Sequence, residues 1–409
     1  MRAGPAERRQ ARPVTTVRLR PLTVVGEGEE VLVGDPATGM FVAMPAVGGV
    51  VVAALLRGAT EEEAAAEAAA FAGEPVDLPA FMATLAELGF LDDRPDDERQ
   101  AVRTAPIQMR RWLAGVSTRV ARPFFGEVAW ACYVVLALFC LAVFITSPSL
   151  LPDPAEDAFV LDDVGLSALL LMPFVLVSTA LHEGGHWLAA RAAGLTARFG
   201  VDRRMMLLVL ETDLSQLWSV PRRRRFGPLL GGMAVDVVVL AALLTARLLI
   251  LKGVWSPEPV VDATLAAWVF VKLAGLLWQC MIFLRTDLYG VLVHALGCRD
   301  LWRIKTLLLR HAFGRLTRAQ AAEVVRAAPA DLRVGRWFRW VWLAGFAVVL
   351  AWFVVFVLPV VVSVLGWGAG RFALGPLDPA FWYALLCVAL LLGPYVLAAG
   401  LAVREHVRR

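Results

Sequence analysis

The chain has 409 residues, of which 59% are hydrophobic and 19% are charged, and its formal net charge is +4. This apolar fraction is above the average of soluble proteins and indicates an integral membrane protein. The basic residues gather beside apolar runs, a pattern typical of membrane topology rather than of nucleic-acid binding. With only five histidines, the chain cannot supply the several histidine boxes of a di-iron hydroxylase.

The N-terminal part of the chain predicts a flexible tail followed by a small folded domain. Residues 1–20 are rich in Arg and Pro and lack periodicity, so we expect a tail without fixed structure. Residues 21–92 alternate short apolar runs with turn and helix signals, among them a Thr60-x-x-Glu63 capping box. The expected elements are strands at 31–34 and 39–44 and helices at 46–56, 60–71 and 78–90. This order predicts an α+β domain similar to a winged helix, and without a basic stripe no nucleic-acid partner is expected.

The same segment resembles the PqqD-like family, the peptide-recognition domains of systems that modify ribosomally made peptides. The resemblance lies in the order of a strand, DPATG, a second strand, a helix, a helix beginning RGATEEE and a helix ending LAELGFL. It implies a partner that is a peptide, such as a ribosomally made precursor, captured in extended form as an added strand.

The rest of the chain predicts a membrane helix bundle. Residues 93–125 are expected to form a charged linker and juxtamembrane segment, and residues 126–409 a polytopic domain with about six spans, so the fold is mainly α. Each apolar run is long enough to cross a hydrocarbon core of roughly 30 Å. The expected spans are 127–147, 165–190, 227–251, 262–284, 338–366 and 379–403.

The loops between the spans predict the orientation of the chain. Arg is concentrated in 195–225 and 285–337, whereas the loops on the other side carry almost no Arg or Lys. The positive-inside rule therefore places both termini in the cytosol. The expected location is the plasma membrane of a bacterium.

The second expected span ends in a motif that binds metals. His182-Glu183-Gly184-Gly185-His186 is an HExxH sequence, and on a helix its two imidazoles lie one turn apart on one face. They can reach a single zinc ion there, with Glu183 as a general base. Ionisable groups within a span are costly to bury and by default indicate a functional site.

A catalytic zinc ion usually has three protein ligands. The motif supplies two of them, and several residues are candidates for the third. Asp287 is favoured, because it follows the fourth span at the level expected for the two histidines. Thr286 is expected to cap a short helix that carries Asp287 and, seven residues on, His294. Asp236 in the third span and Asp213 in the preceding loop are second choices, and His294 is an alternative ligand or a proton donor.

HEGGH within a span, Gly227-Pro228 at the start of the next and the TDLYG sequence about a hundred residues downstream resemble the site-2 protease family of intramembrane zinc metalloproteases. The resemblance covers roughly residues 165–300 and implies one zinc ion held by His182, His186 and Asp287, with Glu183 as catalytic base. The substrate would be a membrane-associated protein or a peptide precursor. The alternative is a membrane-anchored peptide-binding or export accessory without proteolytic activity.

The sequence also allows structural predictions for three further segments. The β-rich residues 198–220 could form a hairpin whose edge pairs with a substrate, or one with no substrate role. The glycines Gly227, Gly231 and Gly232 would let the third span approach a neighbour closely. Residues 299–336 are amphipathic and are expected to lie on the inner leaflet through apolar positions such as Leu301 and Leu308.

Overall fold

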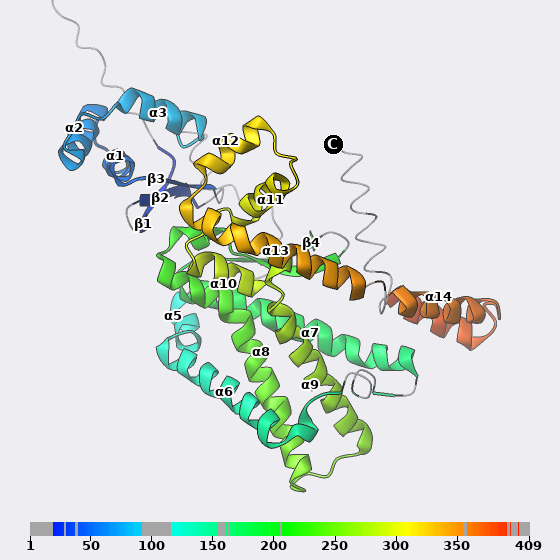
Figure 1. Cartoon of the computed structure of the whole chain (residues 1–409). Helices are drawn as coiled ribbons and strands as arrows, with labels where there is room; N and C mark the ends of the chain where they lie inside the picture. Colours follow the sequence, from blue (N-terminus) through cyan, green and yellow to red (C-terminus); the bar gives the residue numbers. More distant parts are fainter. Residues whose placement is uncertain are drawn as a thin grey trace, which may run out of the picture. The chain divides into compact units, whose positions relative to one another are not determined.

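The structure is a computed structural model that describes residues 19–27, 30–36, 40–91, 116–153, 157, 160–161, 163–195, 197–204, 207–352, 354, 358–390, 393 and 400. It divides into two compact units. Figure 1 shows the chain coloured by position in the sequence. The first comprises residues 1–110 and 215–223, and the second comprises residues 111–214 and 224–409. Most of the predicted tail and the predicted linker lie outside the described residues.

The first unit contains a three-stranded antiparallel sheet and three helices. The strands are β1 (Thr23–Glu27), β2 (Glu30–Asp35) and β3 (Met40–Pro45), in the order β1-β2-β3. The helices are α1 (Ala46–Leu56), α2 (Glu61–Ala72) and α3 (Leu78–Glu87). The predicted capping box is present at the start of α2, where Glu63 N–H donates to Thr60 and the Glu63 carboxylate accepts from Thr60 N–H. Strand β1, short and interrupted by glycine, was not predicted.

A later stretch of the chain belongs to this first unit. The short 3₁₀ helix η3 (Ser215–Ser219) packs against β1 and β2. Leu217 is buried there, and the side-chain amide of Gln216 donates a hydrogen bond of 3.1 Å to the carbonyl of Pro36. The N-terminal unit is therefore discontinuous in sequence, which the predicted boundaries did not include.

Within the described residues, the second unit holds five helices long and apolar enough to cross a membrane. These candidate spans are Thr118–Thr146, Gly165–Ala192, Arg222–Leu251, Pro259–Gln279 and Pro329–Ala351. Four of them contain α6 (Glu127–Thr146), α7 (Val164–Ala192), α8 (Arg222–Leu251) and α9 (Pro259–Gln279), close to the first four predicted spans. The membrane character predicted from composition is confirmed to that extent.

The last two predicted spans are described only in part. The described residues of the apolar run 338–366 lie mostly in α13 (Pro329–Trp352) and α14 (Leu358–Phe372), and α13 begins nine residues before the predicted start. Hydropathy missed this start because the first turns of α13 are charged and pack on protein. Of 379–403, the described part includes an apolar helix over Pro379–Leu390, and most of the remainder lies outside the described residues.

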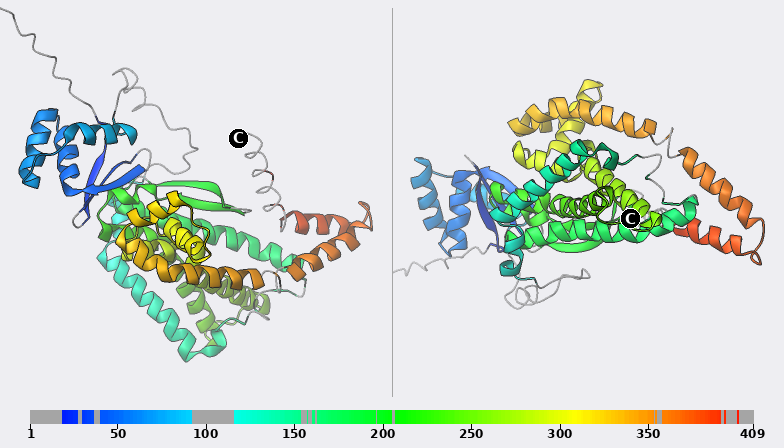
Figure 2. Two further views of the ribbon diagram at one scale, coloured as in Figure 1. Left: turned by 45° about the horizontal axis from the view of Figure 1, so that its top comes forward. Right: turned by 90° about the horizontal axis from the view of Figure 1, so that it is seen from below.

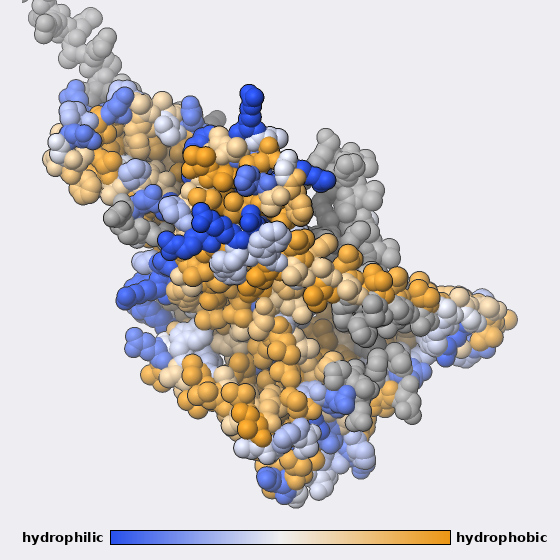
Figure 3. All heavy atoms as spheres, viewed as in Figure 1, coloured by the Kyte–Doolittle hydropathy of each residue, from blue (hydrophilic) through white to orange (hydrophobic). Residues whose placement is uncertain are grey.

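The four long helices α6 to α9 bury one another on their inner sides and leave apolar side chains outside. Their shared core includes Val143, Leu244 and Val269, and Phe174 stacks on Trp268 with ring centroids 4.6 Å apart. The outward surface over α6, α8 and α9 is largely hydrophobic (Figure 3). An exposed apolar surface of this extent is what a bilayer covers.

The predicted amphipathic region buries its apolar side against protein. It forms α11 (Leu301–Ala312) and α12 (Arg318–Arg326), and the apolar side of α11, Leu301 and Leu308 included, is buried in cores shared with α13. Lys305 is also buried, with Nζ 3.9 Å and 3.6 Å from the ring centroids of Trp302 and Trp342. Burial, and then the charge of Arg285, lower the pKa of Lys305 to about 8. An amphipathic pattern fits a protein surface and a lipid surface equally well, so the sequence pattern could not predict which of the two the apolar side contacts.

Candidate metal centre

The HEGGH sequence lies on α7, beginning ten residues before the helix ends, and turns both imidazoles to one side. Nε2 of His182 and Nε2 of His186 are 3.1 Å apart, and each is 3.1 Å from Oδ2 of Asp287. Among the described residues, these three form the group whose ligand atoms all lie within 4.8 Å of one another. The structure therefore brings together the three residues that the sequence favoured as ligands.

The hydrogen bonds of the two Nδ1 atoms determine that the Nε2 atoms face Asp287 as acceptors. Nδ1 of His186 lies 2.7 Å from the carbonyl oxygen of Pro228, which can only accept a hydrogen bond. Nδ1 of His186 therefore carries the proton. Nδ1 of His182 lies 2.7 Å from a carboxylate oxygen of Asp236, which likewise accepts. In the neutral imidazoles both Nε2 atoms then present lone pairs, and with Oδ2 of Asp287 three acceptor atoms converge. Such an arrangement is favourable around a cation.

Asp287 is held at the start of a short helix, α10 (Asp287–Ala295). Its backbone N–H donates to the side-chain oxygen of Gln279 at 3.0 Å, and the hydroxyl of Thr286 donates to the carbonyl of Gln279 at 2.7 Å. The predicted helix is present, but Thr286 makes no side-chain cap hydrogen bond to it. The hydroxyl bonds back to the end of α9 instead, so Gln279 fixes the position of Asp287 relative to that span.

Glycines on α7 and α8 make room for the site. A Cβ at Gly232 would lie 2.5 Å from Nε2 of His186 and 2.6 Å from Nε2 of His182. A Cβ at Gly185 would lie 2.5 Å from the carbonyl oxygen of Gly231, and the reverse holds for Gly231. The predicted close approach of the third span thus occurs at Gly231. Gly227 has only an ordinary contact of 3.9 Å with Trp130, and Gly232 borders the imidazoles.

Glu183, the candidate base, is bound by the β hairpin that follows α7. This hairpin consists of β4 (Arg198–Arg204) and β5 (Leu207–Asp213), and it runs alongside α7 (Figure 2). The backbone N–H of Thr212 donates to Oε2 of Glu183 at 2.9 Å, and the Thr212 hydroxyl donates to the Glu183 carbonyl at 2.9 Å. This N–H therefore points to Glu183 of α7 and away from β4, the strand that pairs with the other edge of β5.

The alternative ligands occupy other places. Asp236 binds Nδ1 of His182 on the side away from the convergent atoms, and its other carboxylate oxygen pairs with Lys272 of α9. His294 is buried on α10, and its Nδ1 bonds the carbonyl of Gly290 in the same helix at 2.9 Å. Neither belongs to the group around the two Nε2 atoms. The side chain of Asp213 lies outside the described part of the structure.

Three residues of the centre were not predicted: Thr212, Gln279 and Lys272. Lys272 had a signal in the sequence, because it is the one charged residue between Asp262 and the end of α9. An ionisable group in a span implies a partner within the bundle. Thr212 and Gln279 are ordinary polar residues beside the membrane, and their sequence context carries no comparable signal.

The chain matches no protein-family model, no curated protein and no solved structure in the comparisons with known proteins.

Proposed function

We propose that this protein is an intramembrane zinc metallopeptidase similar to the site-2 proteases. The observation that carries the proposal is the convergence of the two Nε2 atoms and Asp287 Oδ2, each 3.1 Å from the others, within a bundle of apolar helices. Two imidazoles and one carboxylate are a ligand set that catalytic zinc uses. Asp236 and Asp287 outnumber Lys272 in this cluster, so its net negative charge also favours a divalent cation.

The roles of the protein groups follow from the proposed site. His182, His186 and Asp287 would hold the zinc ion, which supplies Lewis acidity to a water molecule and to the scissile carbonyl. Glu183 takes the proton of the attacking water and returns it to the departing amine, so that the peptide bond is exchanged for a carboxylate and an amine. The Thr212 N–H, 2.9 Å from Oε2, orients the Glu183 carboxylate.

The hairpin supports a route for the substrate. Backbone groups of alternate residues on a strand face the same edge, so residues 208 and 210 of β5 share the edge on which Thr212 meets Glu183. We propose that substrate backbone pairs along this edge, which would keep an unwound segment extended beside the site. The substrate would be a membrane-associated protein or a peptide precursor brought by the N-terminal unit, whose sheet has β1 and β3 as edge strands.

The proposed location is a bacterial plasma membrane with both termini in the cytosol. The support is the Arg-rich segments 195–225 and 285–337 on one side of the spans.

The proposal is tested with Glu183→Gln and Asp287→Ala in the full-length protein purified in detergent. We expect Glu183→Gln to keep one zinc ion per chain by elemental analysis and to lower cleavage of co-expressed single-span reporters and short precursor peptides by about 10²- to 10⁴-fold. Asp287→Ala should lower the zinc content itself, because one of the three convergent acceptors is removed.

A wild-type protein without stoichiometric zinc would contradict the metal centre. Full zinc occupancy without cleavage would favour the peptide-binding or export accessory. Cleavage that does not depend on Glu183 would contradict the proposed role of Glu183 as the base.

A further inference from the structure

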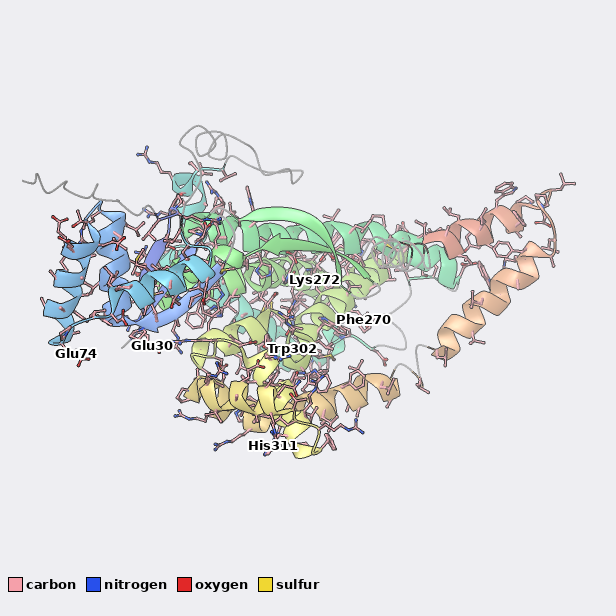
Figure 4. All side chains as sticks on the ribbon, turned by 90° about the horizontal axis from the view of Figure 1, so that it is seen from above. Glu30, Glu74, Phe270, Lys272, Trp302 and His311 are labelled. Carbon is pink, nitrogen blue, oxygen red and sulfur yellow. The ribbon has the colours of Figure 1, made fainter. Side chains whose placement is uncertain are left out.

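Two oppositely charged residues are buried between α8 and α9, within the candidate spans. Asp236 of α8 is 4% exposed and Lys272 of α9 is 5% exposed, and Lys272 Nζ binds Oδ1 of Asp236. Lys272 lies among the helices of the membrane part (Figure 4). Removing two charges from water is expensive even when they pair, so a pair at this depth calls for a role beyond joining two helices.

The second carboxylate oxygen of Asp236 supplies that role. Oδ2 lies 2.7 Å from Nδ1 of His182, whose Nε2 is one of the convergent acceptors. A continuous series of contacts thus leads from Lys272 through Asp236 to His182. Because both oxygens of Asp236 are engaged, this carboxylate is not available as a ligand itself. It acts on the site through the imidazole.

We propose that Asp236 and Lys272 are positioning residues of the metal centre. Asp236 accepts the Nδ1–H of His182, which fixes the tautomer and the ring orientation that present the Nε2 lone pair. Lys272 fixes the carboxylate and balances its charge. The inference rests on the proposed function, because it assigns a cation to the point that Nε2 faces.

The two histidines are therefore unequal. His186 donates its Nδ1–H to a neutral carbonyl, that of Pro228, whereas His182 donates to an ionised carboxylate. A carboxylate partner raises the basicity of the imidazole more than a carbonyl does, so His182 is the stronger donor to the cation.

The test measures metal binding by the full-length protein in detergent, without using peptidase activity. Asp236→Ala combined with Lys272→Met removes both charges and leaves neither buried alone. We expect its zinc affinity, measured by competition with a chromophoric chelator, to be about 10- to 100-fold weaker than that of the wild type. The visible absorption bands of the Co²⁺-loaded protein should also shift, because one imidazole is no longer held.

A matched control lies on the same two helices. Arg247 of α8 pairs with Asp262 of α9 at 3.2 Å, apart from the metal centre. Asp262→Ala combined with Arg247→Met should leave zinc affinity and Co²⁺ bands unchanged. If the Asp236→Ala pair does not fold, Asp236→Asn with Lys272→Met keeps the side-chain shape, and the same direction of loss is expected.

The outcomes separate the two proposals. If the wild type binds metal and the folded double variant keeps the same zinc affinity and Co²⁺ bands, the positioning role alone is overturned. A wild-type protein that binds neither zinc nor cobalt would overturn the proposed function and this inference with it. An equal loss in the Arg247 and Asp262 control would show that any ion pair between α8 and α9 suffices, and would also overturn the inference.

Discussion

Single residues define the proposed metal centre as much by their size as by their donor atoms. The two histidines and Asp287 supply the convergent acceptors, and Gly232 leaves the space in which they meet. From the sequence, HEGGH alone predicted the histidines and the base, because the motif is local and its spacing fits one helix face. The role of Gly232 depends on the rotation of α8 about its axis, which no local pattern encodes.

Gly232→Ala should abolish or strongly weaken cation binding while the bundle remains folded. The added Cβ would lie within 2.6 Å of both Nε2 atoms, so the imidazoles must turn away. Zinc content per purified chain is the measurement. Gly227→Ala, on the same helix and with only a contact of 3.9 Å, is the control and should bind zinc as the wild type does. Unchanged zinc content in Gly232→Ala would contradict the proposed position of the ion.

At the scale of elements, the crossing of α7 and α8 sets the site. Their backbones lie in close contact at Gly185 and Gly231, one residue from His186 and from Gly232. The sequence predicted both helices and the glycine contact, because length, hydropathy and small residues are visible in it. It did not predict which helix was the neighbour or how Asp236 would be used, since both depend on packing between distant segments.

The close crossing of α7 and α8 predicts opposite changes in thermal stability for alanine substitutions at two adjacent glycines. In a helix, alanine is normally more favourable than glycine by about 1 kcal/mol. Gly184→Ala, with nothing within 4 Å of the new Cβ, should therefore keep or raise the thermal stability of the purified protein. Gly185→Ala should lower it, because its Cβ would lie 2.5 Å from the Gly231 carbonyl. Equal melting temperatures for the two variants would contradict the close crossing.

At the scale of the whole molecule, the chain combines a membrane unit with an N-terminal unit that includes residues 215–223. The composition predicted the membrane character, and five candidate spans confirm it to that extent. The first unit's helices were predicted to within three residues at each end, because caps and turns are local. The return of η3 to its sheet was not predicted, since Leu217 carries no local signal of a partner about 180 residues away.

Leu217→Ala should destabilise the N-terminal unit in the full chain. The side chain is 3% exposed, and removing a buried Leu side chain typically costs about 2–5 kcal/mol. Limited proteolysis should cleave within residues 19–91 sooner in this variant than in the wild type. Leu56→Ala, at an exposed position of α1 in the same unit, should show wild-type rates. Equal rates for all three proteins would mean that η3 does not contribute to the unit.

The discontinuity of this unit restricts how the protein can change over evolution. Because the unit is encoded on both sides of HEGGH, exchange of the first 110 residues for another recognition domain would leave nine residues facing a foreign surface. A functional exchange would need compensating substitutions between the HEGGH helix and α8. Substitutions in 19–91 and in 215–223 should therefore covary among descendants of this chain, and recombination confined to the N-terminus should be selected against.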